Sequence, residues 1–256
     1  PFLFSLFTYD CRPVHGSNTI IKFADDTTVI GLIDNDDDSE YREEVQCLAT
    51  WCADNNLLLN TNKTKELIVD LRKKNGHTYS PIYINGRMVE RVTSFKFLGI
   101  HLSEDLSWQI NTTSLIKKAH QRLFFLRLLR KNHLSAILTN FYRCTIESIL
   151  TSCISVWCGN CTIKEKKALQ RVVKTAQRII GIPFPAIVDI QRKQCLHKAH
   201  SIVKDPFHPA HKLFTRLPSG RRFRCLQSKT SRLGNSFYHA AVSLLNSSVH
   251  LSPHIC

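Results

Sequence analysis

The chain has 256 residues, 43% of them hydrophobic, which excludes a disordered tail and allows one or two globular domains with a sizeable core. A formal charge of +15 and an isoelectric point near 9.5 favour a polyanionic partner, nucleic acid before an acidic membrane surface. No stretch approaches the ~20 continuous apolar residues of a membrane-spanning helix, so we expect no membrane partner.

The distribution of acidic residues along the chain and the number of cysteines each support a prediction. Nine of the twenty acidic residues lie between Asp25 and Glu44, and none lies between Leu106 and Ile146, so we expect an acidic patch and a basic remainder with different roles. Ten cysteines without a secretory leader predict reduced thiols in an intracellular protein, nuclear or cytoplasmic. The chain begins at Pro1 in the middle of a pattern, so we expect part of a longer protein.

Strand-like runs dominate the first hundred residues. They are rich in β-branched or aromatic residues and cover Ile20 to Ala24, Thr27 to Ile33, Glu66 to Leu71, Ile82 to Ile84 and Phe95 to Leu102. Asn85-Gly86 predicts a tight hairpin turn. Residues 39–55 repeat apolar side chains at helical spacing, with Glu43 and Glu44 near the start, where the helix dipole favours anions. A helix packed on a sheet is the simplest architecture.

From Asn111 onward the apolar period becomes helical. The first predicted helix has an apolar face formed by Leu115, Ile116, Ala119, Leu123 and Leu126, and the second one formed by Leu134, Ile137, Leu138, Phe141 and Ile149. The third helix begins with a capping box, Thr162 and Glu165, and ends at Gly181. The fold prediction is therefore α+β, strands with packed helices followed by an α-helical region.

The third helix also carries a basic stripe. Lys167, Arg171, Lys174 and Arg178 recur every three to four residues, opposite the apolar face. A solvated surface explains one such stripe, but an excess of basic residues in three consecutive helices favours contact with phosphates. After Ile182 four prolines are expected to interrupt any long element, and Pro218 to Cys225, which includes Arg221 and Arg222, predicts a small basic appendage.

Two adjacent carboxylates, Asp25 and Asp26, lie between apolar strands. Adjacent Asp residues are common in ordinary turns, so the pair alone is weak evidence. Two like charges held on a rigid hairpin nevertheless repel unless a cation offsets them. Mg²⁺ prefers carboxylates together with substrate phosphates, and two-metal sites use them for phosphoryl transfer. The basic remainder of the chain suits that chemistry on nucleic acid.

Four blocks in order resemble the reverse transcriptases of non-LTR (LINE-type) retrotransposons. "FADD" (Phe23 to Asp26) resembles motif C, and "PFLFSLFTYD" before it resembles the end of motif B. The segment from Trp51 to Lys73, with the pattern Asn60, Lys63, Thr64 and Lys65, resembles motif D. Phe95 to Trp108 resembles the primer-grip hairpin region. The order and spacing of the four blocks are more specific than any one block.

The resemblance implies roles and domains. Asp25 would bind catalytic Mg²⁺, Asp26 would support it, and Lys63 or Lys65 would lie near the phosphates of the incoming deoxynucleotide. Phe97, Leu98 and Gly99 would position the DNA primer on its RNA template. The alternative interpretations are purely structural: the two lysines would lie in a solvated turn, and Phe97 and Leu98 would be core residues of a strand. The implied domains are the end of the palm (1–108), a basic thumb-like domain (109–181) and a basic appendage (182–256).

One part of the family pattern is missing. The aspartate of motif A and the fingers are not found in this chain, so we expect a truncated RNA-directed DNA polymerase that is inactive alone. The alternative is a basic helical module that binds nucleic acid without catalysis. Its stacking platforms would come from Phe124, Phe125, Tyr142 and Trp157.

Two further hypotheses concern metals. Zinc ligands are available in the run Cys153, Cys158 and Cys161 and in Cys195, His197, His200, His208 and His211, but neither run has the spacing of a known finger or knuckle. Phe141 to Gly181 also resembles a helical segment found beside AlkB-type tRNA-modifying oxygenases. Their iron site needs two histidines and a carboxylate, and the usual His-x-Asp pair occurs nowhere in the chain.

Overall fold

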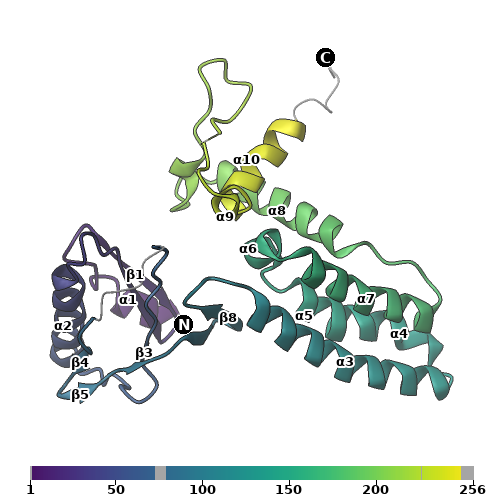
Figure 1. Cartoon of the computed structure of the whole chain (residues 1–256), viewed down its shortest axis with the longest axis horizontal. Coiled ribbons are helices and arrows are strands. Elements are labelled where there is room, and N and C mark those ends of the chain that lie inside the picture. The colour runs from purple at the N-terminus through teal and green to yellow at the C-terminus, as the bar shows by residue number, and fades with distance from the viewer. Residues whose placement is uncertain (1, 73–78, 226, 249–256) are drawn as a thin grey trace. The chain divides into compact units, whose positions relative to one another are not determined.

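The computed structural model describes residues 2–72, 79–225 and 227–248, and its mixture of helices and small sheets confirms an α+β fold (Figure 1). The chain divides into two compact units. The first comprises Pro1–Phe95 with Ser103–Asp105, and the second Lys96–Leu102 with Leu106–Cys256. The predicted domain borders at residues 108 and 181 stay predictions.

In the first unit a helix covers one face of a hairpin. Strands β1 (Asn18–Phe23) and β2 (Asp26–Gly31) pair antiparallel, and helix α2 (Ser39–Asp54) packs against them, while α1 (Phe2–Phe7) precedes β1. Gly31 makes the close approach possible, because a Cβ there would lie 2.7 Å from Cδ2 of Tyr41. The predicted helix over residues 39–55 is confirmed.

Glu44, in the first half of α2, is buried. Its carboxylate accepts hydrogen bonds from the backbone N–H groups of Val14, at 3.0 Å, and His15, at 3.1 Å, and from Nδ2 of Asn18 at 3.3 Å. A buried carboxylate needs such donors in place of water. The contacts hold the segment before β1 against α2.

The remaining strands of this unit are short. β4 (Tyr83–Ile84) and β5 (Arg87–Met88) form the predicted hairpin, with positive φ at both Asn85 and Gly86. β3 (Lys65–Glu66) pairs in parallel with β6 (Glu90–Arg91). The predicted strand from Glu66 to Leu71 is wrong beyond Glu66, since the chain leaves its partner strand after two residues. A small core joins α2 to β4 and β5 and contains Val45, Ala49, Ile82, Ile84 and Val89.

The run from Phe95 to Leu102, predicted as a strand from its residue types and as part of a hairpin region by the resemblance, is a hairpin. β7 (Ser94–Phe97) and β8 (Ile100–Ser103) flank a turn at Leu98 and Gly99, which have φ angles of 45° and 90°. Only Gly99 signals this turn in the sequence, because leucine rarely adopts a positive φ.

The second unit is built on a helical core. α3 (Gln109–Lys131) lies beside α7 (Ile163–Ile180) and α5 (Ser148–Thr151) (Figure 1). The predicted face of α3 is confirmed, because Ala119, Leu123 and Leu126 are fully buried. α7 has the predicted capping box, and Gly181 ends it with φ of 89°.

The second predicted helix is confirmed over residues 138–151, where the backbone stays helical through a π-helical turn. A 3-10 turn (Ser135–Ile137) leads into α4 (Leu138–Phe141), the π-helical turn (Tyr142–Glu147) and α5. Leu138 is buried as predicted, but Leu134 and Ile137 are about half exposed, because the regular helix begins after them. α6 (Ile154–Trp157) and a 3-10 turn (Cys158–Asn160) lead to α7.

The prediction that prolines interrupt every long element after Ile182 is wrong. α8 (Ile187–Lys204) lies between Pro185 and Pro206, and α10 (Phe237–Ser248) packs on it. A 3-10 turn (His211–Leu213) and α9 (Ser231–Gly234) connect them. The pair has its own core of Cys195, Ala199, Ile202, Phe214, Phe223, Ala241, Val242 and Leu245. No described helix is long and apolar enough to cross a membrane.

Candidate functional site

The paired aspartates lie at the tip of the β1–β2 hairpin. Phe23 pairs with Asp26, so Ala24 and Asp25 form the two-residue turn. Ala24 has a φ of 51°, a left-handed conformation that costs a residue with a Cβ roughly 1–2 kcal/mol. Both carboxylates are exposed. The hairpin therefore presents Asp25 and Asp26 outward at a strained turn.

These carboxylates do not make a magnesium site by themselves. Within residues 2–72, 79–225 and 227–248, no three His, Cys, Asp or Glu side chains gather in a way that could hold a metal ion. Mg²⁺ needs near-octahedral oxygen coordination, of which two adjacent exposed carboxylates supply only a small part. The residues described here do not fit a resident Mg²⁺, and no catalytic step is assigned through one.

The two candidate lysines occupy different environments. Lys63 is exposed in a turn that Asn60 closes, because the Lys63 backbone N–H donates to the Asn60 carbonyl oxygen at 3.0 Å. Lys65 forms an ion pair with Glu90 across the β3–β6 pair. The ammonium of Lys65 therefore stabilises the strand pair, whereas that of Lys63 faces solvent. Lys73, at the end of the motif D segment, lies outside the described residues.

The predicted primer-positioning residues form the β7–β8 turn. The Leu98 side chain is 44% exposed and Gly99 is exposed, whereas Phe97 is half-buried. Leu98 is thus not a core residue of a strand. Their role toward a primer stays a prediction.

The basic stripe of α7 is continuous and open to solvent. Lys167, Arg171, Lys174 and Arg178 are all exposed, and Lys164 extends the row by one turn at the N-terminal end. Sequence reasoning missed Lys164, although its spacing of three from Lys167 signals it. None of the five forms an ion pair with an acidic residue in the described part of the chain. We call these five residues the α7 ridge.

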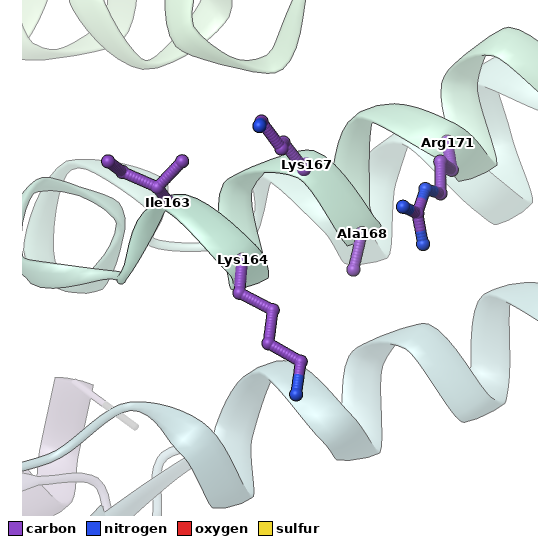
Figure 2. A pocket seen from close by; sticks show the side chains of 5 residues that line it. All are labelled: Ile163, Lys164, Lys167, Ala168 and Arg171. Atoms are coloured by element: carbon purple, nitrogen blue, oxygen red, sulfur yellow. The ribbon is translucent and has the colours of Figure 1, made fainter.

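A shallow hollow of about 400 Å³ lies along the first half of the ridge. Figure 2 shows Lys164 and Lys167 pointing to different sides of α7, with Arg171 further along the helix. Three exposed cations along one helix can contact anionic groups such as phosphates. The opposite face of α7, with Leu169, Val172, Val173 and Ala176, is buried, which fixes the direction of the ridge.

Arg221 and Arg222 are exposed in the loop that Arg216 and Phe223 close by a β-bridge. The Arg216 guanidinium lies 5.1 Å from the centroid of the Phe223 ring and donates to the Gly220 carbonyl oxygen at 2.8 Å. These contacts hold the two ends of the loop together. The two arginines lie apart from the ridge in sequence and element, and their contact with nucleic acid stays a prediction.

The proposed zinc ligands are not gathered. Cys153 is exposed, while Cys158, Cys161 and Cys195 are buried. Burial raises the pKa of Cys161 to about 12 and that of Cys195 to about 11, as expected for thiols in a hydrophobic core. The Nδ1 atom of His211 lies 3.1 Å from the Ile202 carbonyl oxygen, a local contact.

The four candidate stacking residues divide into two pairs. Tyr142 and Trp157 are fully buried in the core beside α3 and α7. Phe124 and Phe125 are 60% and 52% exposed on α3. Only the phenylalanines can meet a base.

Comparison with known families gives a match over part of the second unit. Residues 108–148 are similar to the family described as "Alkylated DNA repair protein alkB homolog 8, N-terminal". The match covers α3 to the start of α5, and it overlaps the segment predicted from the sequence, residues 141–181, only over residues 141–148. No curated protein and no solved structure matches the chain. The likeness is confined to this helical segment.

Proposed function

We propose that the chain is part of an RNA-directed DNA polymerase of the non-LTR retrotransposon type, to which it contributes one catalytic hairpin and a nucleic-acid-binding helical region. The observation that carries the proposal is the position of Asp25 and Asp26, exposed together at the turn of a two-stranded hairpin. A structural turn could carry any polar pair. A left-handed alanine between an aromatic residue and two carboxylates fits a site where the backbone is held under strain for function.

The outer face of the same hairpin supports the proposal. Ile21, Phe23 and Ile30 are 42%, 61% and 44% exposed, on the face opposite α2. Exposed apolar side chains next to open strand edges are unfavourable in water and favour cover by a further strand or layer. In the proposal, that layer carries the additional carboxylate of motif A. Asp25 and Asp26 then contribute to a site whose remaining ligands lie outside the described residues.

The proposal is tested by primer extension on an RNA template. This chain is compared with the same chain joined to the coding sequence immediately upstream, each with and without Asp25→Asn. We expect extension of the DNA primer by the joined, unsubstituted protein alone. Asp25→Asn keeps the size of the side chain and removes its charge. A loss of primer extension in this variant would therefore show that the reaction requires the carboxylate.

One control variant accompanies this test. Asp34→Asn removes an exposed carboxylate from the same acidic region, outside the hairpin, and should leave extension unchanged. Extension that survives Asp25→Asn in the joined protein, or no extension by a folded joined protein, would contradict the polymerase proposal.

A second candidate is a nucleic-acid-binding module without catalysis, favoured by the five exposed cations of the α7 ridge. It predicts binding that survives Asp25→Asn and weakens with salt or with loss of Arg171, Lys174 or Arg178. The polymerase proposal alone requires Asp25 for a chemical reaction.

A third candidate, a segment of an AlkB-type tRNA-modification protein, has the family match over residues 108–148 in its support. That match lies in the helical core and includes no acidic residue up to Ile146. The described residues hold no cluster of His and carboxylate ligands suitable for iron. The match therefore supports a shared helical segment more than a shared oxygenase reaction.

A further inference from the structure

The outer face of α3 has an apolar patch open to solvent. Phe124, Phe125 and Leu128 are 60%, 52% and 47% exposed, whereas Leu123 and Leu126 on the other side of the helix are fully buried. The two phenyl rings meet edge to face, with centroids 5.7 Å apart. Single exposed apolar residues are ordinary, but two aromatic rings and a leucine together form a surface that a partner can use.

Cations flank this patch on the same side of the helix. Lys117 and Lys131 lie seven residues before and after Phe124, two helical turns away in each direction, and Lys118 lies seven before Phe125. All three lysines are exposed, and the structure describes no ion pair between any of them and a carboxylate. No acidic residue occurs between Leu106 and Ile146, so the face is uniformly basic around its apolar centre.

The lysines around the apolar patch of α3 distinguish between its possible binding partners. A second copy of the chain docked face to face would bring the lysines of both copies together, which is unfavourable. A membrane-surface helix needs a large apolar face along its length, whereas this patch has only two phenyl rings and one leucine. Single-stranded nucleic acid matches both features, since bases stack on aromatic rings and phosphates contact lysines. A duplex hides its base faces within its own stack.

We infer that the outer face of α3 binds single-stranded nucleic acid, with unpaired bases stacked on Phe124 and Phe125 and phosphates contacting Lys117, Lys118 and Lys131. The inference rests on the proposed function in taking nucleic acid as the ligand. It goes beyond that function in two ways. It specifies that the ligand is single-stranded, and it assigns recognition of the single strand to a surface of α3 that is separate from the α7 ridge.

The test measures the affinity of the full chain for a labelled deoxythymidine oligonucleotide and for a blunt duplex, each of about 12 nucleotides, by fluorescence anisotropy. The double variant Phe124→Leu/Phe125→Leu keeps apolar side chains but removes the rings. Phe124→Tyr/Phe125→Tyr keeps the rings. Phe207→Leu is the matched control, because Phe207 is 95% exposed in the loop after α8.

We expect the leucine variant to lose about fivefold or more in affinity for the single strand for each base that stacks, with little change for the duplex. The tyrosine variant and Phe207→Leu should bind as the original chain does. Equal affinity of the leucine variant for the single strand would overturn the inference, as would an equal loss for the duplex.

Further outcomes separate this inference from the proposed function. If substitutions in the α7 ridge weaken binding of both forms while the leucine variant binds normally, the stacking surface is refuted and nucleic-acid binding stands. If the chain binds neither form, both are refuted. If the leucine variant instead abolishes self-association or binding to anionic phospholipid vesicles and leaves the single strand bound, the occupant of this face is another copy or a membrane, and the inference fails.

Discussion

At the scale of single residues, the backbone of Ala24 shows how the hairpin presents its carboxylates. The sequence predicted a hairpin at this place from two apolar runs and a pair of aspartates. It did not predict that alanine would take the left-handed conformation, because glycine or asparagine is the usual signal for it. The strain is visible only in the structure, where the pairing of Phe23 with Asp26 leaves Ala24 in the turn.

The substitution Ala24→Gly should relieve this strain. Glycine adopts positive φ without a Cβ penalty, so the local free energy of unfolding of the hairpin should rise by roughly 0.5–1 kcal/mol. Hydrogen exchange of the β1 and β2 amides measures it. Ala53→Gly, in the exposed part of helix α2, is the matched control and should lower stability by about 1 kcal/mol. Faster exchange in the Ala24→Gly hairpin would contradict the strained turn.

A second prediction at this scale concerns Glu44. Burial by itself would raise the pKa of Glu44, but the N–H donors of His15 and Val14 and the Asn18 amide outweigh it, and the net pKa is lowered from 4.5. A lowered pKa in the folded state stabilises the protein above the unfolded pKa, and this contribution is lost as pH falls through the folded pKa. The first unit should therefore lose stability below about pH 4.5.

The substitution Glu44→Gln should remove that pH dependence and cost roughly 1–3 kcal/mol at pH 7, because hydrogen bonds to a charged acceptor are replaced by weaker ones. Hydrogen exchange of residues 14–18 and of α2 at pH 7 and pH 3 measures both effects. Glu43→Gln is the control on the same helix, since Glu43 is exposed and meets only His15 at 3.2 Å. A similar response of the two variants would disprove the role of the buried carboxylate.

At the scale of elements, α7 combines a capped start with a charged outer face. Thr162 accepts a hydrogen bond from the Glu165 backbone N–H at 3.2 Å, and the Glu165 carboxylate accepts from the Thr162 backbone N–H at 2.7 Å. The same carboxylate accepts a hydrogen bond from the Thr112 hydroxyl of α3 at 2.8 Å. The cap therefore also joins the starts of the two longest helices of this core.

The substitution Thr162→Ala should lower the free energy of unfolding by about 1 kcal/mol, the usual cost of losing a side-chain cap. Urea unfolding of the chain, followed by far-UV circular dichroism, measures it. Thr162→Ser keeps the hydroxyl and should stay within about 0.5 kcal/mol of the original chain. An equal effect of alanine and serine would show that the hydroxyl does not cap the helix.

The elements also show how far the sequence predicts the fold. α2, α3 and α7 were predicted because each repeats apolar residues at helical spacing over about three turns. α8 was missed because Pro185 and Pro206 were interpreted as interruptions, whereas they flank the helix. Four of the five residues of the α7 ridge were predicted from spacing, and Lys164 was missed. The predicted apolar face of α3 leaves out Phe124 and Phe125, so their exposure follows from that face, whereas their ring-to-ring contact is visible only in the structure.

At the scale of the whole molecule, charge is divided along the chain. Nine of twenty acids lie between Asp25 and Glu44 in the first unit, whereas the α7 ridge and the basic face of α3 belong to the second. Such a division suits a protein in which one part presents carboxylates and the other neutralises phosphates. The account therefore depends on the second unit binding nucleic acid through the ridge.

The most direct test of this account is the salt dependence of binding to an RNA·DNA primer–template, comparing the chain with the triple variant Lys167→Gln/Arg171→Gln/Lys174→Gln. We expect salt-sensitive binding by the chain. In the variant, the slope of log K against log salt should fall by about 2 to 3, since each phosphate contact contributes close to one. The triple variant Lys198→Gln/Lys212→Gln/Lys229→Gln removes the same charge from exposed lysines outside the ridge, serves as the control and should change the slope less. Binding that is indifferent to salt, or an unchanged slope in the ridge variant, would contradict the account.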